Sequence, residues 1–238
     1  MQEDNVAVVI GVGPGLGAAV AKRFAREGYA LALVARKAES SEPVRAEIEQ
    51  QGGVARVLTA DAGDPAAVAA VFAEIQGKLG PVGVLVYNAG AFRMGEVAQL
   101  TPEQFEQGFR IGCFGAFLCA REVVPGMVER GRGTLLFTGA TASLRSGAGF
   151  AAFAAGKFGL RAVAQSLARE VGPKGVHVAH VIIDGQIDTP HVRAMMPERE
   201  ARTMLAPDAI AESYWQLHAQ HPSAWTHELD LRPSPERF

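Results

Sequence analysis

The sequence predicts an α/β fold in which a doubly wound parallel sheet of about seven strands carries helices on both faces. Short runs rich in Val, Leu and Ile recur along the chain, and helix-like segments separate them. Continuously apolar runs of this length are typical of strands that are buried on both sides. Neighbouring parallel strands need crossover connections, which helices supply, so the alternation favours a parallel sheet. Residues 1–238 have the size of a single domain.

The strands and helices can be placed in order along the chain. The spacing of Leu16, Val20 and Phe24 predicts a helix between the first two apolar runs. Another helix is expected after Asp64-Pro65, a capping residue followed by a first-turn proline. The predicted strands are residues 5–10, 30–35, 54–59, 82–87, 134–139 and 176–183, with a last short strand within 226–233.

The composition is that of an ordinary soluble protein and argues against several classes of function. Hydrophobic residues make up 48% of the chain and charged residues 20%, with a net charge of -2, so nucleic-acid binding is not expected. No stretch approaches the ~18 uninterrupted apolar residues of a membrane span, and the acidic N-terminus is unlike a signal peptide. Cys113 and Cys119 lie six apart in one predicted helix and cannot pair. We therefore expect a cytoplasmic protein without a nucleic-acid or membrane partner.

A glycine-rich turn follows the first predicted strand directly. The segment GVGPGLG contains Gly11, Gly13, Gly15 and Gly17, and a helix begins near Leu16. A turn between a strand and a helix presents backbone N–H groups and the positive end of the helix dipole to a phosphate. Glycine is needed because a Cβ would block both the tight turn and a close approach of the pyrophosphate. The segment predicts a Rossmann-type dinucleotide site to which these five residues contribute.

The end of the second predicted strand indicates which dinucleotide binds. An NAD site carries an acidic residue there, which holds the ribose hydroxyls. This chain has Arg36 and Lys37 instead, and the guanidinium group of Arg36 can bind a 2′-phosphate. The sequence therefore favours NADP as the cofactor. The alternative is that both cations are ordinary solvated surface residues.

Further motifs follow the third, fourth and sixth predicted strands, and one lies in the helix before the sixth. They are Asp61-Ala62, Asn88-Ala89-Gly90, Lys157, and the segment 184–189 with Ile187 and Thr189. With the glycine turn, and in this order, they resemble the short-chain dehydrogenase/reductase family over nearly the whole chain. The resemblance implies that these residues contact the cofactor. It also implies that Lys157 belongs to the catalytic group and holds the cofactor ribose.

The remaining catalytic positions of that family are altered. Counting back from Lys157, the position of the family's tyrosine acid falls on Phe153, and that of its serine falls on Ala140. The family's asparagine corresponds to Gly112. Phenylalanine keeps the shape of tyrosine but has no proton to exchange. If only these polar groups have been lost, then Phe153→Tyr, Ala140→Ser and Gly112→Asn should restore reductase chemistry.

Other side chains are candidates for the missing proton donor. Tyr87 precedes the Asn-Ala-Gly motif, and Ser143 lies close to Ala140. A packed strand tyrosine and a turn-forming serine are the alternatives. Asp184 stands where the family has proline, beside the expected nicotinamide position. It either favours the oxidised, positively charged ring or is a hydrogen-bonded turn residue.

The histidines do not predict a metal site. His177 and His180 lie three apart on a predicted strand, so they point to opposite faces. His218 and His221 could share a helix face but have no clear third ligand.

Residues 186–222 are predicted to be a helical lid over the substrate. This region is more polar than the preceding chain and has Pro197 and Pro207 at the expected helix boundaries. Methionine side chains would give it an adaptable apolar surface. They are Met195, Met196 and Met204.

The helices around Phe114 and Phe158 are rich in small and apolar residues. The family resemblance implies that these helices pair across a two-fold axis. We therefore expect a homodimer or a homotetramer.

Two functions remain open on the sequence alone. The first is an NADP-dependent short-chain oxidoreductase that acts on an unidentified carbonyl, alcohol or conjugated double bond without the usual tyrosine. The second is a catalytically silent NADP(H)-binding sensor or partner subunit. Retention of the phosphate turn fits both, whereas the loss of three polar positions fits the second well.

Overall fold

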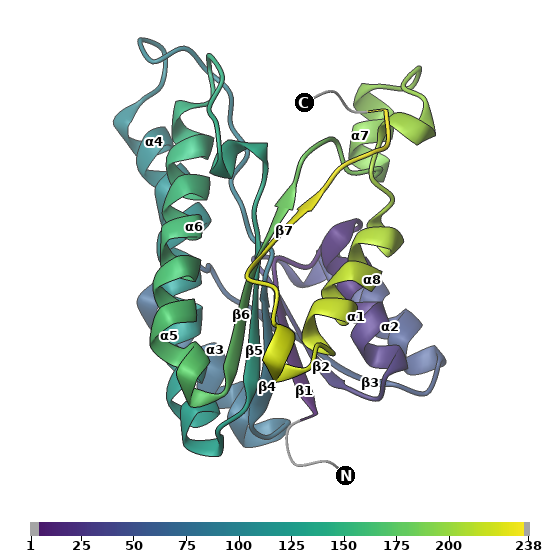
Figure 1. Cartoon of the computed structure of the whole chain (residues 1–238). Helices are drawn as coiled ribbons and strands as arrows, with labels where there is room; N and C mark the ends of the chain where they lie inside the picture. Colours follow the sequence, from purple (N-terminus) through teal and green to yellow (C-terminus); the bar gives the residue numbers. More distant parts are fainter. Residues whose placement is uncertain (1–4, 236–238) are drawn as a thin grey trace.

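One parallel sheet of seven strands forms the centre of the part of the chain that the structure describes, residues 5–235 (Figure 1). The computed structural model has the strand order β3-β2-β1-β4-β5-β6-β7, and every neighbouring pair is parallel. The predicted α/β fold with its doubly wound sheet is confirmed. The strands are β1 (Val6–Ile10), β2 (Ala30–Ala35), β3 (Val54–Thr59), β4 (Val82–Tyr87), β5 (Gly133–Thr138), β6 (Val176–Ile183) and β7 (Glu228–Leu231).

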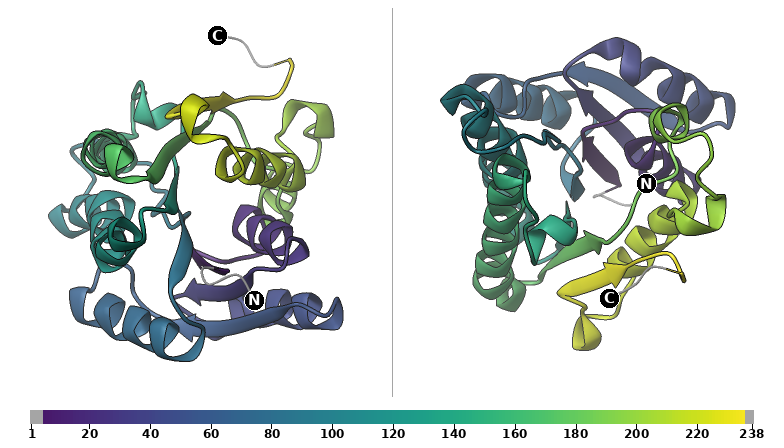
Figure 2. Two further views of the ribbon diagram at one scale, coloured as in Figure 1. Left: turned by 60° about the horizontal axis from the view of Figure 1, so that its bottom comes forward. Right: turned by 90° about the horizontal axis from the view of Figure 1, so that it is seen from above.

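Helices cover both faces of the sheet. Figure 1 shows α1, α2 and α8 on one face and α3, α5 and α6 on the other, and the views in Figure 2 show the sheet between these two layers. Each face buries its own apolar core, with Phe24 and Tyr214 in one and Phe72 and Leu160 in the other. The helices are α1 (Leu16–Arg26), α2 (Glu42–Gln50), α3 (Pro65–Lys78), α4 (Pro102–Phe109), α5 (Gly115–Arg130), α6 (Ala151–Val171), α7 (Pro190–Met195) and α8 (Pro207–His218).

A single long helical segment combines α4 and α5. A π-helical turn, η2 (Arg110–Phe114), joins them. The segment Pro102–Arg130 is long and apolar enough to cross a membrane, but 56% of its most apolar window is buried inside the domain, as in a core helix of a soluble protein. Cys113 and Cys119 both lie in this segment as buried free thiols.

The predicted lid region, 186–222, consists of two different parts. Helix α8 packs along α1 and buries Ile210, Tyr214 and Leu217 in the core, so this part is not a lid. The polar residues of α8 lie on the outer face of an amphipathic core helix. This polarity is why the sequence analysis assigned α8 to the lid. Met204 is also buried. The segment 186–206, with α7, extends beyond the sheet at its carboxyl edge (Figure 1).

The two ends of this segment are fastened together. Ile187 and Leu205 form a parallel bridge, and the Asp188 N–H donates to the Leu205 carbonyl oxygen at 2.8 Å. Inside the segment, the Arg193 guanidinium binds both carboxylate oxygens of Asp188 at 2.6 Å. The segment is therefore braced internally, and its role as a lid stays a prediction.

Candidate functional site

The glycine-rich turn joins β1 to α1 at the carboxyl edge of the sheet. Gly11 has a φ of +90°, and a Cβ there would lie 2.6 Å from the Ala89 backbone nitrogen, so only glycine fits. A Cβ on Gly17 would lie 2.6 Å from the Gly11 carbonyl oxygen. The Asn88 side chain donates from Nδ2 to that same oxygen at 3.0 Å. The turn and the segment after β4 are therefore held together as one surface.

The middle of the turn is open to a ligand. A Cβ on Gly13 would meet no atom within 4 Å. Helix α1 begins at Leu16 without a side-chain cap or an acidic residue in its first turn, so its N–H groups and positive dipole end suit an anion. The Leu16 side chain is buried, so any contact of this residue with an anion would be through its backbone N–H.

The start of the 186–206 segment lies against the glycine turn. A Cβ on Gly15 would lie 2.8 Å from Thr189 Cγ2. The Thr189 hydroxyl accepts the Val192 N–H at 3.2 Å and caps α7. Ile187 is tied to Leu205. The structure thus brings Thr189 to the phosphate-binding turn, although the two lie far apart in the sequence.

A cavity of about 640 Å³ opens beside the turn. Arg36 and Lys37 are exposed at its edge, directly after β2. Ser40, which the sequence analysis missed because no motif marks it, also lines the cavity, and its Oγ donates to the Lys37 carbonyl oxygen at 2.7 Å. Most of the predicted cofactor residues share this cavity: Gly11, Arg36, Lys37, Asp61, Ala62, Asn88, Ala89 and Gly90.

Lys157 projects from α6 towards the same region. Its side chain is buried, and Nζ donates to the Thr138 carbonyl oxygen at 2.6 Å. A Cβ on Gly90 would lie 3.7 Å from Nζ, so the amine lies next to the wall of the cofactor cavity. Burial lowers the pKa of the Lys157 amine to about 8. The amine therefore stands where it can donate to a ribose hydroxyl.

Phe153 occupies the place expected for the tyrosine acid, four residues before Lys157 on α6. The Lys157 Nζ lies 5.8 Å from the Phe153 ring centroid. The ring packs edge to face against Phe92 with a centroid distance of 5.2 Å. Phe92 in turn packs against Phe150 at 6.0 Å. An aromatic cluster therefore stands at the position where the resemblance implied a proton donor.

The space expected for the asparagine is filled by backbone. A Cβ on Gly112 would lie 3.0 Å from Gly156 Cα, and a Cβ on Gly156 would lie 2.5 Å from the Gly108 carbonyl oxygen. The helix α4 and the turn η2 therefore pack closely against α6 at positions that are occupied by glycine. The close contact counts against the expectation that Gly112→Asn adds activity, because the new side chain would have to displace Gly156, and the effect on activity stays a prediction.

Neither predicted alternative hydroxyl faces the site. The Tyr87 hydroxyl is fully buried and donates to the Ile111 carbonyl oxygen at 2.6 Å, and burial raises its pKa. The Ser143 side chain is also fully buried, and its Oγ accepts the Ala140 N–H at 3.1 Å. Both residues have the packing and turn-forming roles that were the alternatives.

Asp184 is a hydrogen-bonded residue at the end of β6. It accepts a hydrogen bond from the Thr141 hydroxyl. Its Oδ2 lies 3.4 Å from Arg232 and 3.7 Å from Arg145, which the sequence analysis did not connect with it. The buried carboxylate is thus compensated by two cations. This arrangement corresponds to the turn-residue alternative.

The described residues contain no group of three or more histidine, cysteine or acidic side chains placed to hold a metal ion. The His218 ring binds the Tyr29 hydroxyl at 2.6 Å and the Thr134 hydroxyl at 2.9 Å. His221 contacts Ser223 instead of sharing a site with His218. These two histidines therefore have structural partners.

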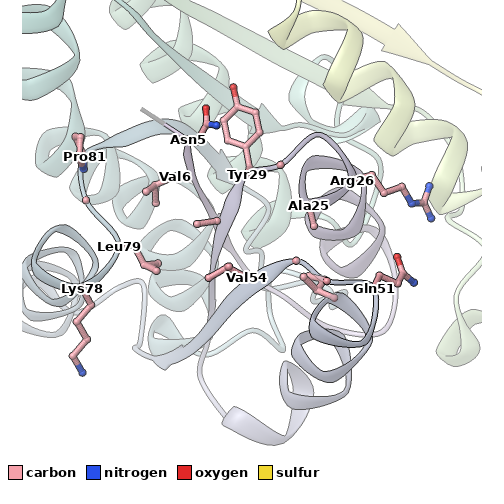
Figure 3. A pocket seen from close by; sticks show the side chains of 16 residues that line it. Asn5, Val6, Ala25, Arg26, Tyr29, Gln51, Val54, Lys78, Leu79 and Pro81 are labelled. Atoms are coloured by element: carbon pink, nitrogen blue, oxygen red, sulfur yellow. The ribbon is translucent and has the colours of Figure 1, made fainter. Parts of the chain in front are cut away.

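A second cavity, of about 930 Å³, lies at the opposite edge of the sheet (Figure 3). Asn5, Ala30, Val54 and Pro81 line it, at or next to the beginnings of four strands. Ligands of open parallel sheets bind outside the carboxyl ends of the strands. The cofactor site is therefore assigned to the smaller cavity.

Comparisons with known proteins agree with this site. A sequence profile described as short chain dehydrogenase matches residues 5–200. The 1-deoxy-11-beta-hydroxypentalenate dehydrogenase of Streptomyces exfoliatus is 30% identical, over 98% of this chain and 93% of its own. A short-chain dehydrogenase from Rhodopseudomonas palustris is 40% identical with a TM-score of 0.82, covering 96% of this chain and 99% of that one. A metagenomic short-chain oxidoreductase, solved with NADP, is 29% identical with a TM-score of 0.84 and coverages of 96% and 97%.

The profile match extends from β1 past the start of α7, and so includes the glycine turn, the segment after β4 and Lys157. Gly11 of the glycine turn and Asn88, Ala89 and Gly90 of the segment after β4 line the cofactor cavity, and Lys157 lies next to Gly90 in its wall. The chain belongs to the short-chain dehydrogenase/reductase family.

Proposed function

We propose that the protein is an NADP(H)-dependent oxidoreductase that transfers a hydride without a tyrosine hydroxyl. One observation carries the proposal: most of the residues expected at the cofactor line one cavity, while the residue at the expected position of the acid is Phe153. The glycine turn fits a pyrophosphate because added Cβ atoms would fill the cradle. The metagenomic relative that was solved with NADP supports the choice of cofactor.

The preference for NADP over NAD rests on the end of β2. The strand ends at Ala35 and continues into Arg36 and Lys37, where an NAD enzyme would carry an acid. Both cations are exposed at the edge of the cavity, so they are available to a 2′-phosphate. The Ser40 hydroxyl, which precedes α2, donates to the Lys37 carbonyl oxygen and so holds the backbone of Lys37 in place.

The residues of this chain would position the cofactor and exclude water from one side of it. NADP(H), when bound, supplies or accepts the hydride. Lys157 would donate to a cofactor hydroxyl, and Phe153 presents an apolar ring to the substrate. Because the Tyr87 and Ser143 hydroxyls are fully buried, and that of Tyr87 already donates to a backbone carbonyl, the proton would come from water. A positioned acid contributes roughly 10²- to 10⁴-fold in rate, so turnover should be slow for the family.

Cofactor titration tests the proposal. Arg36→Ala should weaken NADPH binding by roughly 1.5–3 kcal/mol, about ten- to a hundredfold, because a charged hydrogen bond to the phosphate is lost. Binding of NADH should stay the same. Arg26→Ala, an exposed arginine at the end of α1, is the matched control and should change neither. Equal losses for both cofactors would refute the role of Arg36.

Turnover separates the oxidoreductase from the silent alternative. NADPH oxidation with ketones and conjugated enones should exceed the rate without protein, and deuterium should pass from labelled NADPH to the product. Tight NADPH binding without any such transfer would support a sensor or partner subunit. A cytoplasmic location is part of this proposal, since the free thiols of Cys113 and Cys119 suit a reducing compartment.

A further inference from the structure

We propose that the substrate is an uncharged molecule with a flat, apolar ring system, which binds against the aromatic cluster of Phe92, Phe150 and Phe153. The inference rests on the proposed function, because it names the substrate class of the same site. It is argued from how the cluster is built, how much of it is exposed, where it lies and which polar groups surround it.

The cluster is held in place by two segments that are distant in the sequence. Phe92 belongs to the segment that follows β4, whereas Phe150 and Phe153 lie at the start of α6. The rings meet edge to face with centroid distances of 5.2 and 6.0 Å. The Gly95 N–H donates to the Gly149 carbonyl oxygen at 2.9 Å and ties the two segments together. Phe92 is thus a positioned ring.

This positioned ring is largely uncovered. Phe92 is 63% exposed, and Met94, two residues further along the chain, is 57% exposed. An apolar surface that is fixed in place and open to water gains free energy when a ligand covers it. Aromatic rings favour offset or edge-to-face contact with another ring, so a flat ring system suits this surface.

The cluster borders the cofactor cavity. The Phe153 ring lies 5.8 Å from Lys157 Nζ, and that amine is next to Gly90 in the cavity wall. A molecule that rests on Phe92 and Phe153 would therefore lie beside the cofactor. The position suits a substrate better than a remote effector.

Two hydroxyls of η3 (Thr141–Ser143), a turn that packs against α6, are already hydrogen-bonded. The Ser143 hydroxyl accepts the Ala140 N–H, and the Thr141 hydroxyl donates to Asp184. A polyol placed here would lose its water without new partners, which disfavours binding. These two hydroxyls therefore favour an apolar substrate over a sugar-like one.

On the other side of the carboxyl edge, α7 ends in two exposed methionines. Met195 is 58% exposed and Met196 38% exposed. Methionine side chains adapt to irregular apolar shapes. They give the 186–206 segment an apolar surface that would match such a ligand if it closes.

Calorimetric titration of the full chain with 2-tetralone, a bicyclic aromatic ketone, tests the inference. The titration is made with saturating NADP⁺, the oxidised cofactor, so that binding of the ketone is measured without turnover. It is then repeated without the cofactor. We expect 2-tetralone to bind at least roughly tenfold more tightly than erythrulose, a sugar ketone. Phe92→Ala should weaken 2-tetralone binding by roughly tenfold or more.

Two controls make the result specific. Phe117→Ala removes an equally large exposed ring from α5 and should leave 2-tetralone binding within about twofold. The NADP⁺ affinity of Phe92→Ala should equal that of the wild type. The substrate class is overturned if erythrulose binds as tightly as 2-tetralone, if 2-tetralone fails to bind, or if Phe92→Ala leaves its affinity unchanged. Binding of 2-tetralone without hydride transfer would leave this inference standing and count against the proposed function alone.

Discussion

Lys157 on α6 is a buried lysine, and its amine is hydrogen-bonded to a backbone carbonyl oxygen. Only 5% of the residue is exposed, and Nζ donates to the Thr138 carbonyl oxygen. Desolvation disfavours the charged form, which places the pKa near 8 instead of the ordinary 10.5. The cost of keeping a charge here is a sign that the amine serves a ligand, since an apolar side chain would pack at lower cost.

This lowered pKa predicts how stability depends on pH. Between about pH 8 and 10.5 the unfolded chain holds the lysine proton and the folded chain does not, so the free energy of unfolding rises with pH. Lys157→Met should therefore be more stable than the wild type near pH 7, by up to about 3 kcal/mol. The advantage should shrink as the pH approaches 10.5. Urea denaturation of both proteins at pH 7.5 and pH 10 measures this, and an equal difference at the two values would contradict it.

The missing hydroxyl gives a second prediction for single residues. Tyrosine differs from Phe153 by one oxygen, and Lys157 is in place to lower its pKa. Phe153→Tyr combined with Ala140→Ser should raise the NADPH-dependent reduction of 2-tetralone by roughly tenfold or more, since a positioned acid contributes 10²- to 10⁴-fold. The affinity for NADPH should not change. Robust wild-type turnover that the double variant does not exceed would mean that the site has its own proton donor.

At the level of elements, local patterns determined what could be predicted. Strands such as β2 and β4 were placed correctly because a strand buried on both faces is a continuous apolar run. The glycine turn and the cations after β2 follow from motifs within a few residues. The role of α8 could not be predicted, because its apolar stripe does not say which neighbour covers it. The aromatic cluster and the contact of Gly112 with Gly156 depend on segments that meet only in the folded chain.

The glycine contact between the helices leads to a prediction about stability. Gly112→Asn should destabilise the protein by roughly 1–3 kcal/mol, because its side chain has to push α6 away from η2. It should also fail to add activity to Phe153→Tyr. Gly77→Ala is the matched control, because a Cβ at this exposed position of α3 meets nothing within 4 Å. That change should stabilise by roughly 0.4–1 kcal/mol. Thermal denaturation of both variants measures these changes in stability. If Gly112→Asn were as stable as the wild type, the helices could separate without cost and the prediction would be wrong.

At the scale of the whole molecule, the exposed phenylalanines of residues 5–235 fall into two groups. Phe92 lies at the carboxyl edge, whereas Phe105, Phe109, Phe117 and Phe158 lie on the helical layer of α4, α5 and α6. Phe114 and Phe117 are stacked with a centroid distance of 6.3 Å. Several exposed rings on one helical layer indicate a surface for another protein, and the expected partner is a second copy of this chain.

We therefore expect the wild type to be a dimer or tetramer in light scattering at micromolar concentration. Phe117 and Phe158 are 46% and 43% exposed, and changing both to Glu would place charges in the interface. The double variant should be a monomer that still binds NADPH. Val54→Glu, at an exposed position of the edge strand β3, should leave the assembly intact. A monomeric wild type would disprove the interface.

The bridge between Ile187 and Leu205 has a consequence for how such proteins diversify. The residues between these two positions form a loop outside the sheet, and the bridge joins the two ends of this loop. Such a loop can change in length and sequence at little thermodynamic cost to the domain. Arg36 and Lys37 lie directly after β2, outside this loop, and need not change with it. If the loop contacts the substrate and the two cations contact the cofactor, as proposed, substrate range and coenzyme preference can be inherited separately, and one lineage can explore new substrates with the same cellular pool of reducing equivalents.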